Sequence, residues 1–179
     1  MNTHTLRFVL LGGTKTGKTT FFYKLDDRFQ NEITPTIGVD VVTYKYEKNG
    51  FTCKNIIWDT SGDERFLCIV NSYLQNNCAF LLFFDLNNPV TFDCLENWIK
   101  RINKNNSCKH KHPIFLIGNK KDLPQKVNNE AIGDLVEKYQ LIYITTSAKI
   151  YDSEVIIEAI INEIYIRYIS KNSYCCGIR

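Results

Sequence analysis

The sequence predicts an α/β protein in which a mostly parallel β-sheet is covered by helices. Short apolar runs alternate with helical patterns along the whole chain, which is typical of this class. Residues 79–84 are apolar without a break, as expected of a strand that is buried on both faces of a sheet. Two further strand candidates flank Asn49 and Gly50, a strong hairpin signal, so we expect one antiparallel pair in the sheet.

The expected elements follow one another in a regular order. The expected strands cover residues 6–11, 39–46, 51–58, 79–85, 114–118 and 141–144. One expected helix begins near Lys18. Three further helices are expected at about 91–104, 130–139 and 153–168. The helix at 91–104 carries apolar residues at helical spacing, namely Leu95, Trp98, Ile99 and Ile102. For the last helix Ser153 is the expected N-cap. Its pattern, with one charged and one apolar face, comes from Val155, Ile156, Ala159, Ile160, Glu163 and Ile164.

Length and composition predict one ordinary globular domain. The chain has 179 residues, 44% of them hydrophobic and 23% charged, which is enough for a core without disulfides. A net charge of +3 without basic runs gives no reason to expect a nucleic-acid partner. The N-terminus lacks the apolar stretch of a secretory signal, and residues 79–84 are too few to span a bilayer. We therefore expect a cytoplasmic protein whose seven cysteines are mainly reduced thiols.

A glycine-rich loop follows the first expected strand and opens the first expected helix. Residues 12–19 match the pattern G-x-x-x-x-G-K-[ST], in the context that this pattern requires. Backbone N–H groups of such a loop point at phosphate oxygens, which Gly12 and Gly17 allow to approach closely. Lys18 is expected to reach the β- and γ-phosphates, and the Thr19 hydroxyl to bind Mg²⁺. The loop thus predicts a bound nucleoside triphosphate.

The segment that follows the strand at 114–118 predicts which base is bound. Residues 119–122 read N-K-K-D, at the carboxyl edge where α/β sheets bind ligands. A carboxylate at Asp122 can accept hydrogen bonds from both the ring N–H and the exocyclic amine of guanine. Adenine offers neither in that arrangement, so it would leave the carboxylate unpaired. The alternative interpretation is a plain polar turn, which we weigh below the functional one.

A third motif, D-x-x-G at residues 59–62, ends the expected strand at 51–58. A carboxylate at Asp59 can hold a magnesium-bound water, and the amide of Gly62 can contact a γ-phosphate. The motif is weak alone, and it gains weight from its spacing after the phosphate loop.

With these three motifs in this order, the chain resembles the Ras superfamily of small GTPases over nearly its whole length. Residues 34–40, which contain I-G-V-D, resemble switch I of the Rab family. Residues 57–60 and 64–66 together with Ile69 resemble its switch II, and residues 146–149 resemble its S-A-K base loop. The resemblance implies a P-loop NTPase fold, a Ras-like G domain with a six-stranded mostly parallel sheet, one antiparallel hairpin and five flanking helices. The expected G domain covers residues 1–170, with a short tail at 171–179.

The resemblance also implies the roles of individual residues. Thr36 would bind Mg²⁺ with Thr19 and Asp59 and would sense the γ-phosphate. Phe29 would stack across the guanine ring, with a core aromatic as the alternative interpretation. The expected nucleotide-binding residues are Thr14, Lys15, Thr16, Gly17, Lys18, Thr19, Thr20, Phe29, Thr36, Asp59, Gly62, Asn119, Lys120, Asp122, Ser147, Ala148 and Lys149. The expected catalytic residues are Lys18, Thr36, Gly62 and Asp63.

The chain departs from the family pattern at several positions, among them Asp63, Lys15 and Val41. Where the family has a glutamine that orients the attacking water, this chain has Asp63, which is shorter, lacks the amide donor and repels the γ-phosphate. We therefore expect slow intrinsic hydrolysis of GTP to GDP and phosphate. Lys15 stands where glycine is common, and we expect its side chain to point to solvent. Trp58 and Tyr73 resemble two members of the effector-binding aromatic triad, but Val41 replaces the third, so we expect an altered effector surface.

The C-terminus resembles the Rab ending that receives two geranylgeranyl groups, here on Cys175 and Cys176. Two lipid chains give stable membrane attachment where one gives only marginal binding. An unmodified tail is the alternative, and the tail is short for this family. The resemblance implies a peripheral protein on the cytosolic face of endomembranes, and its expected partners are effectors, an exchange factor, an activating protein, Rab escort protein and GDP-dissociation inhibitor. The group Cys108, His110 and His112 is too incomplete for a metal site and is expected to be an exposed loop.

Three hypotheses about function follow. The first is a Rab-type GTPase switch in vesicle traffic. The second is a GTP-binding module that signals by occupancy with negligible hydrolysis, which Asp63 favours. The third is a P-loop kinase of a small metabolite, against which the guanine-type motif at 119–122 and the missing arginine-rich lid both argue.

Overall fold

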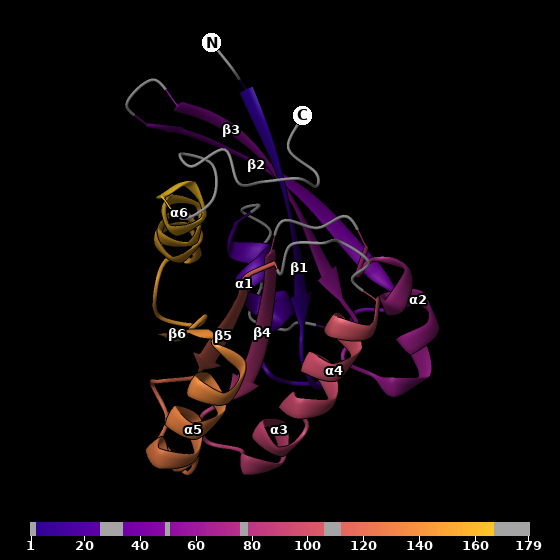
Figure 1. Cartoon of the computed structure of the whole chain (residues 1–179), viewed down its shortest axis with the longest axis vertical. Coiled ribbons are helices and arrows are strands. Elements are labelled where there is room, and N and C mark those ends of the chain that lie inside the picture. The colour runs from indigo at the N-terminus through magenta and orange to yellow at the C-terminus, as the bar shows by residue number, and fades with distance from the viewer. Residues whose placement is uncertain (1–2, 26–33, 49–50, 76–78, 106–111, 167–179) are drawn as a thin grey trace.

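The computed structural model describes residues 3–25, 34–48, 51–75, 79–105 and 112–166, and contains one six-stranded sheet. The strands are β1 (Thr3–Leu11), β2 (Val39–Lys48), β3 (Phe51–Thr60), β4 (Ala79–Asp85), β5 (Ile114–Asn119) and β6 (Ile142–Thr145). Their order across the sheet is β2-β3-β1-β4-β5-β6. All neighbouring pairs are parallel except β2 and β3, which form the predicted antiparallel pair (Figure 1). The expected turn at Asn49 and Gly50 lies outside the described residues.

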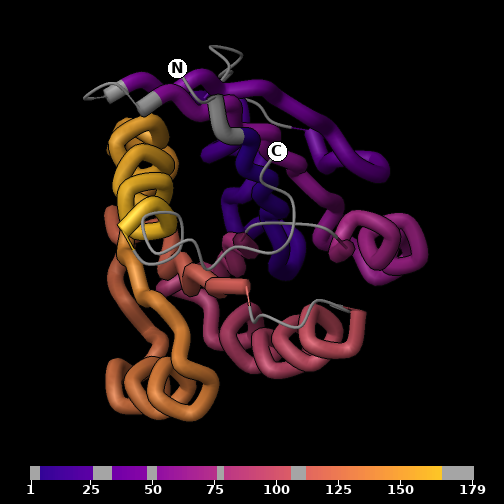
Figure 2. The backbone as a smooth tube through the Cα atoms, turned by 45° about the horizontal axis from the view of Figure 1, so that its top comes forward, coloured from indigo at the N-terminus to yellow at the C-terminus, as the bar shows by residue number. Residues whose placement is uncertain are grey.

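Helices cover both faces of the sheet (Figure 2). They are α1 (Lys18–Lys24), α2 (Leu67–Ser72), α3 (Pro89–Asp93), α4 (Leu95–Asn105), α5 (Asn129–Tyr139) and α6 (Ser153–Ile164), with a 3₁₀ turn η1 (Glu64–Phe66) before α2. We regard α3 and α4 as one helix interrupted at Cys94. The described residues then carry the five helices that the family resemblance implied. The short switch helix α2 was not located from the sequence.

Alternating side chains of the central strands build two separate cores. Leu6, Phe8 and Leu10 of β1 pack with apolar residues of α1 and α6 on one face. Val9 and Leu11 point to the other face, where α2, α4 and α5 contribute. Because β1 and β4 are covered on both sides, their side chains are buried at every position from Phe8 to Leu11 and from Ala79 to Asp85.

The last helix differs from the prediction in two details. Its N-cap is Asp152, whose carboxylate accepts from the Glu154 N–H, and Ser153 is the first helical residue. The buried face consists of Ile157, Ile160, Ile161 and Ile164, together with Ser153, whereas Val155 is 63% exposed. The sequence pattern had placed the apolar face nearly a quarter turn away, because a helix this rich in isoleucine offers several overlapping apolar stripes.

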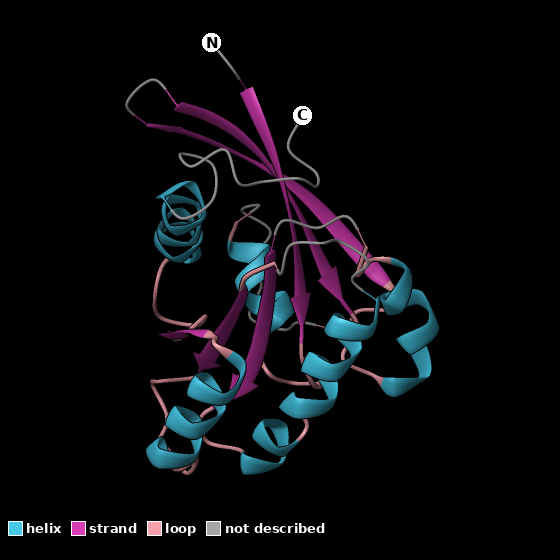
Figure 3. Cartoon of the chain, viewed as in Figure 1, coloured by secondary structure: helices cyan, strands magenta, loops and turns pink. Residues whose placement is uncertain are grey.

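The parallel strands all run toward one edge of the sheet (Figure 3). The loops that follow β1, β3, β5 and β6 therefore meet there, which is where ligands bind in open α/β sheets. None of the helices in the described ranges has the length and apolar character needed to span a bilayer.

Candidate nucleotide and magnesium site

The phosphate loop connects β1 to α1 and folds around the Lys18 side chain. The Lys18 Nζ donates to the Gly12 carbonyl at 2.9 Å and to the Gly13 carbonyl at 2.7 Å. Burial lowers the pKa of Lys18 to about 8, and the nearby Asp59 carboxylate partly opposes this by favouring the charged form. A buried ammonium held at the floor of a loop is placed to neutralise an anion that binds over the loop.

Neighbouring atoms lie so close to both predicted loop glycines that there is no room for a Cβ atom. Gly12 has φ 129°, and a Cβ there would lie 2.2 Å from the Phe83 carbonyl oxygen of β4. Gly17 has φ 91°, and a Cβ would lie 2.1 Å from Nδ2 of Asn119. No larger residue fits either position without displacing a strand or the base motif.

The remaining loop residues divide into buried and exposed ones. Thr16 is buried, and its Oγ1 donates to the Gly13 carbonyl at 3.0 Å, which tightens the loop. Thr14 is exposed and Thr20 is half-buried on α1. Lys15 is exposed, as predicted, and has φ 61°, a left-handed conformation that is unfavourable for a residue with a side chain. The usual glycine at this position would adopt it without strain.

Three predicted magnesium ligands meet in what we call the metal corner, defined by Thr19, Thr36 and Asp59. Both hydroxyls lie on one carboxylate oxygen: Thr19 Oγ1 is 2.7 Å and Thr36 Oγ1 is 2.9 Å from Asp59 Oδ2. The two hydroxyls are 2.8 Å apart. The other oxygen, Asp59 Oδ1, is buried and has no hydrogen-bond partner among the described residues. Burial raises the pKa of Asp59, against the hydrogen bonds from Thr19 and Thr36 and the charge of Lys18.

The metal corner fits Mg²⁺ chemically. Magnesium takes oxygen ligands, with few from the protein and the rest from phosphates and water. Two hydroxyls and one carboxylate supply such a set, and a cation would neutralise the buried carboxylate whose Oδ1 is otherwise unsatisfied. Thr36 reaches this corner from the segment before β2, as the resemblance implied.

The base motif is connected to both the phosphate loop and the S-A-K segment. Asn119 is buried, donates through Nδ2 to the Thr16 carbonyl at 2.7 Å and accepts at Oδ1 from the Ala148 N–H at 2.8 Å. Ser147 Oγ donates to Asp122 Oδ1 at 2.5 Å. Residues 119–122 and 146–149 therefore form one unit, which we call the base pocket.

Lys120 has a partner that sequence reasoning missed. Its Nζ lies 2.7 Å from Asp85 Oδ2, at the end of the neighbouring strand β4, and its backbone has φ 63°. The register that pairs Asp85 with Asn119 explains why the two side chains meet. Asp85, the charged residue directly after the apolar run at 79–84, was the signal in the sequence for this ion pair.

The D-x-x-G motif lies against the phosphate loop. A Cβ on Gly62 would be 2.5 Å from the Gly13 carbonyl carbon and 2.6 Å from the Thr14 nitrogen, so only glycine fits here. The Ser61 N–H donates to the Gly38 carbonyl at 2.9 Å, which ties this segment to the start of β2. The two predicted switch segments are therefore in direct contact with each other.

The Asp63 carboxylate is hydrogen-bonded to Arg65, two positions later in the chain. It caps η1 by accepting from the Arg65 N–H at 2.9 Å, and it also accepts from Arg65 Nε and from Nη2 at 2.7 Å. These hydrogen bonds to Arg65 lower the pKa of Asp63, which is therefore ionised at neutral pH. Arg65 was not among the predicted site residues, although an Asp two positions before an Arg at a helix start is a recognisable capping pattern.

Beside this turn lies an exposed apolar surface formed by the two switch segments. The rings of Trp58 and Tyr73 are 6.0 Å apart, and the predicted replacement Val41 is exposed opposite Trp58 in the β2–β3 register. Ile37 and Ile69 are exposed as well. Of the other predicted residues, Phe29, Cys175 and Cys176 lie outside the described residues, as do Cys108 and His110. The exposed loop expected there is wrong at His112, which is buried with its ring edge-on to Phe80 of β4.

Comparison with known proteins agrees with this geometry. The family model described as "Ras family" matches residues 7–166. The chain is 36% identical to the Ras-related protein Rab-27B of Bos taurus over 156 residues, 80% of this chain and 71% of the relative. It is 35% identical to Ras-related protein Rab-5B of Plasmodium falciparum over 91% of this chain and 79% of the relative. It is 31% identical to Ras-related protein Rab-11A of Dictyostelium discoideum over 96% and 80%.

The chain therefore belongs to the Ras family, in its Rab branch of small GTPases. The predicted fold, a Ras-like G domain with a mostly parallel six-stranded sheet, is confirmed. Guanine-nucleotide binding and GTP hydrolysis are the general properties that membership brings.

Proposed function

We propose that this chain is a Rab-type switch, which binds GTP and GDP with Mg²⁺ and regulates intracellular vesicle traffic. The observation that carries the proposal is the metal corner, in which Thr36 from the first switch segment joins Thr19 and Asp59. A site that links the phosphate loop to a switch segment can report which nucleotide is bound. Thr36 and Gly62 would be held when a γ-phosphate is present and released after its hydrolysis.

The phosphate end would be bound mainly by the loop backbone and by Lys18. Lys18 would exchange its contacts with the Gly12 and Gly13 carbonyls for the β- and γ-phosphates. Thr19, Thr36 and Asp59 would hold Mg²⁺ directly or through water. When bound, Mg²⁺ supplies positive charge that neutralises the phosphate oxygens. The phosphate-end residues proposed to contact nucleotide are Thr14, Lys15, Thr16, Gly17, Lys18, Thr19, Thr20 and Gly62.

The base end would select guanine through Asp122. Ser147 orients the Asp122 carboxylate, and Asn119 fixes the Ala148 N–H beside it. Lys120 and Lys149 would complete the walls of the pocket, and Phe29 would stack across the ring. Adenine would leave the carboxylate without its two donors.

Slow intrinsic hydrolysis is proposed from the position of Asp63. Both carboxylate oxygens are bonded to Arg65, so the side chain is committed to capping η1 rather than to orienting a water. Its negative charge would also oppose the negative γ-phosphate. A second candidate function, a GTP-occupied module with negligible hydrolysis, is favoured by the same bonding of Asp63 to Arg65.

Membrane attachment is proposed from the C-terminal sequence. Geranylgeranyl groups on Cys175 and Cys176 would hold the G domain, residues 1–170, at the cytosolic face of an endomembrane through the short tail at 171–179. The exposed apolar surface around Trp58 would receive effectors. Rab escort protein, GDP-dissociation inhibitor, an exchange factor and an activating protein are the other proposed partners.

Nucleotide analysis of the purified protein tests the proposal. Denaturing extraction followed by chromatography should release guanine nucleotide in near-equal amount to protein. Bound adenine nucleotide would refute it. Single-turnover hydrolysis with and without an activating protein then separates the two candidates: a switch turns over with the activator, whereas an occupancy module does not.

A further inference from the structure

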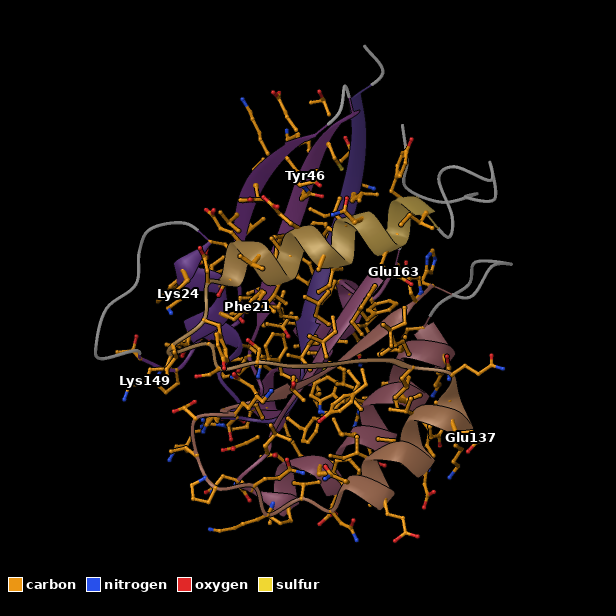
Figure 4. The ribbon with its side chains drawn as sticks, turned by 90° about the vertical axis from the view of Figure 1, so that its left-hand side faces the viewer. Phe21, Lys24, Tyr46, Glu137, Lys149 and Glu163 are labelled. Carbon is orange, nitrogen blue, oxygen red and sulfur yellow. The ribbon has the colours of Figure 1, made fainter. Side chains whose placement is uncertain are left out.

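Helix α1 connects the two ends of the site. It begins at Lys18 and Thr19, in the phosphate loop, and ends at Lys24. The Lys24 Nζ donates to the Lys149 carbonyl at 2.8 Å and to the Tyr151 carbonyl at 3.1 Å. Figure 4 shows Lys24 and Lys149 at the same side of the molecule, although they lie 125 positions apart in the chain. One short helix therefore holds phosphate-binding residues at its start and the base pocket at its end.

The segment that Lys24 holds, residues 146–151, is otherwise anchored from the opposite side. Ala148 is fixed through its N–H to Asn119, and Ser147 through its hydroxyl to Asp122, both beyond the end of β5. The N–H groups of Ile150 and Tyr151 turn back onto the Ser147 carbonyl. Lys24 supplies two bonds from the α1 side, and they act on the half of the segment that follows Ala148.

Burial does little to hold that half in place. Ile150 is 64% exposed and Tyr151 is 49% exposed, so neither side chain anchors the segment in the core. Where apolar contacts are few, local opening is limited by the remaining hydrogen bonds. A cationic donor shared by two carbonyls is stronger than a neutral one.

We propose that Lys24 is a positioning residue that closes the base pocket and sets how long guanine nucleotide stays bound. The proposal rests on the nucleotide-binding function proposed above. Without the Lys24 bonds, the half of the segment after Ala148 opens more often, and the base loses the contact of Lys149. Dissociation then accelerates equally for GDP and GTP, while Mg²⁺ binding and hydrolysis at the other end of α1 stay unchanged.

The test compares release of a fluorescent guanine nucleotide from four full-length proteins: wild type, Lys24→Met, Lys24→Arg and Lys45→Met. Lys45 is exposed on β2 and makes the matched control for loss of one surface charge. Loss of the two hydrogen bonds should speed release from Lys24→Met about fivefold, a modest factor because both bonds are exposed to solvent. Lys24→Arg keeps a donor and should restore most of the wild-type rate, and Lys45→Met should match the wild type.

Two further measurements separate positioning from general destabilisation. The fivefold factor should persist when Mg²⁺ is chelated, and single-turnover GTP hydrolysis by Lys24→Met should equal that of the wild type. A wild-type release rate in Lys24→Met, or a fall in hydrolysis equal to the gain in release, would overturn the inference. If the wild type itself binds no guanine nucleotide, the proposed function fails, which is a separate outcome.

Discussion

The base pocket and the metal corner are built in contrasting ways. In the base pocket, Asn119 uses both ends of its amide and the carboxylate of Asp122 is oriented by Ser147. In the metal corner, Thr19 and Thr36 crowd onto a single oxygen of Asp59, and the second oxygen is buried without a partner. The first region satisfies these polar groups within the chain, whereas the second leaves one oxygen of a buried carboxylate without a hydrogen bond among the described residues.

This difference indicates what each region needs from a ligand. A satisfied hydrogen-bond network is rigid and costs little to maintain, so the base pocket is formed in advance of binding. A buried carboxylate with a raised pKa is costly until a cation or a proton neutralises it. We expect the phosphate end to contribute most of the ligand-dependent stability and the base end to contribute selectivity.

Replacement of Lys18 should have the largest effect. Lys18→Ala removes the buried ammonium proposed to bind the phosphates, and charge-assisted hydrogen bonds of this kind contribute about 1.5–3 kcal/mol each. We expect affinity for GTP and GDP to fall by at least about 100-fold. Equilibrium titration with labelled nucleotide measures it, with Lys54→Ala, an exposed lysine on β3, as the control. A fall below tenfold would mean that the backbone of the loop dominates.

Replacement of Asp122 should come next and should change selectivity. An amide in Asp122→Asn offers a donor where the carboxylate accepts, so the exocyclic amine of guanine loses its partner. We expect about a 100-fold loss of GTP affinity and a gain for xanthosine triphosphate, which carries a carbonyl at that position. Competition between the two nucleotides measures the change. An unchanged preference for guanine would remove Asp122 from the base contact.

Replacement of Asp59 should weaken the effect of Mg²⁺ on nucleotide release but should stabilise the nucleotide-free protein. Asp59→Asn removes a charge that the metal corner would present to Mg²⁺, so chelation should no longer speed nucleotide release. The wild-type release rate should rise about tenfold or more on chelation, because the protein then loses a cation that holds the phosphates. The variant should not respond, because its amide is a weaker magnesium ligand than a carboxylate. Stopped-flow release with and without chelator gives both values. A variant that still responds fully to chelation would contradict the metal corner.

The same variant gives a pH test on the nucleotide-free, chelated protein. Burial raises the pKa of Asp59 above the ordinary 3.8, so folding is penalised as pH rises from that value through the higher folded-state pKa. The penalty is absent at lower pH, where the carboxyl is protonated in both the folded and the unfolded states. Asp59→Asn should therefore unfold at higher denaturant concentration than the wild type at pH 7, with the advantage shrinking in acid.

Restoration of glutamine at the catalytic position should have the smallest effect of these four changes. Asp63→Gln breaks the pair with Arg65 and supplies an amide that can orient water. We expect single-turnover hydrolysis to accelerate about tenfold, which corresponds to about 1.4 kcal/mol of barrier. Asp63→Asn is the matched control, because it removes the charge but is too short to act as glutamine does. Equal rates for the wild type and Asp63→Gln would refute the proposal that Asp63 slows hydrolysis.

Much of the site was predictable because its motifs are local. The loop at residues 12–19 needs glycine at positions 12 and 17 and lysine at position 18, and all three lie within this one short segment. The same holds for Asp59, near the end of β3, and Gly62, which follows it three positions later. The sequence located all six strands to within three residues at each end. Unbroken apolar runs marked β4 and β5, which are buried on both faces, and the hairpin signal at Asn49 and Gly50 marked β2 and β3.

The parts that the sequence left undetermined depend on contacts between distant segments. The pairs of Asn119 with Thr16, Lys120 with Asp85 and Lys24 with Lys149 exist only because the strand order brings these loops to one edge. The capping role of Asp63 and the short helix α2 were missed for a different reason. Helices this short have weak intrinsic preference, so their packing on the sheet decides whether they form.

The sequence by itself determined the fold class, the family, and the residue types proposed to surround a guanine nucleotide, since each follows from a periodicity or a short motif. Only the tertiary structure decided that the base pocket is satisfied, that the metal corner has an unpartnered oxygen, and that Asp63 is bonded to Arg65. The physical reason is that hydrogen-bond satisfaction depends on positions in space. Those positions are set by how β1, β3 and β5 lie side by side with β4, and no single segment contains that information.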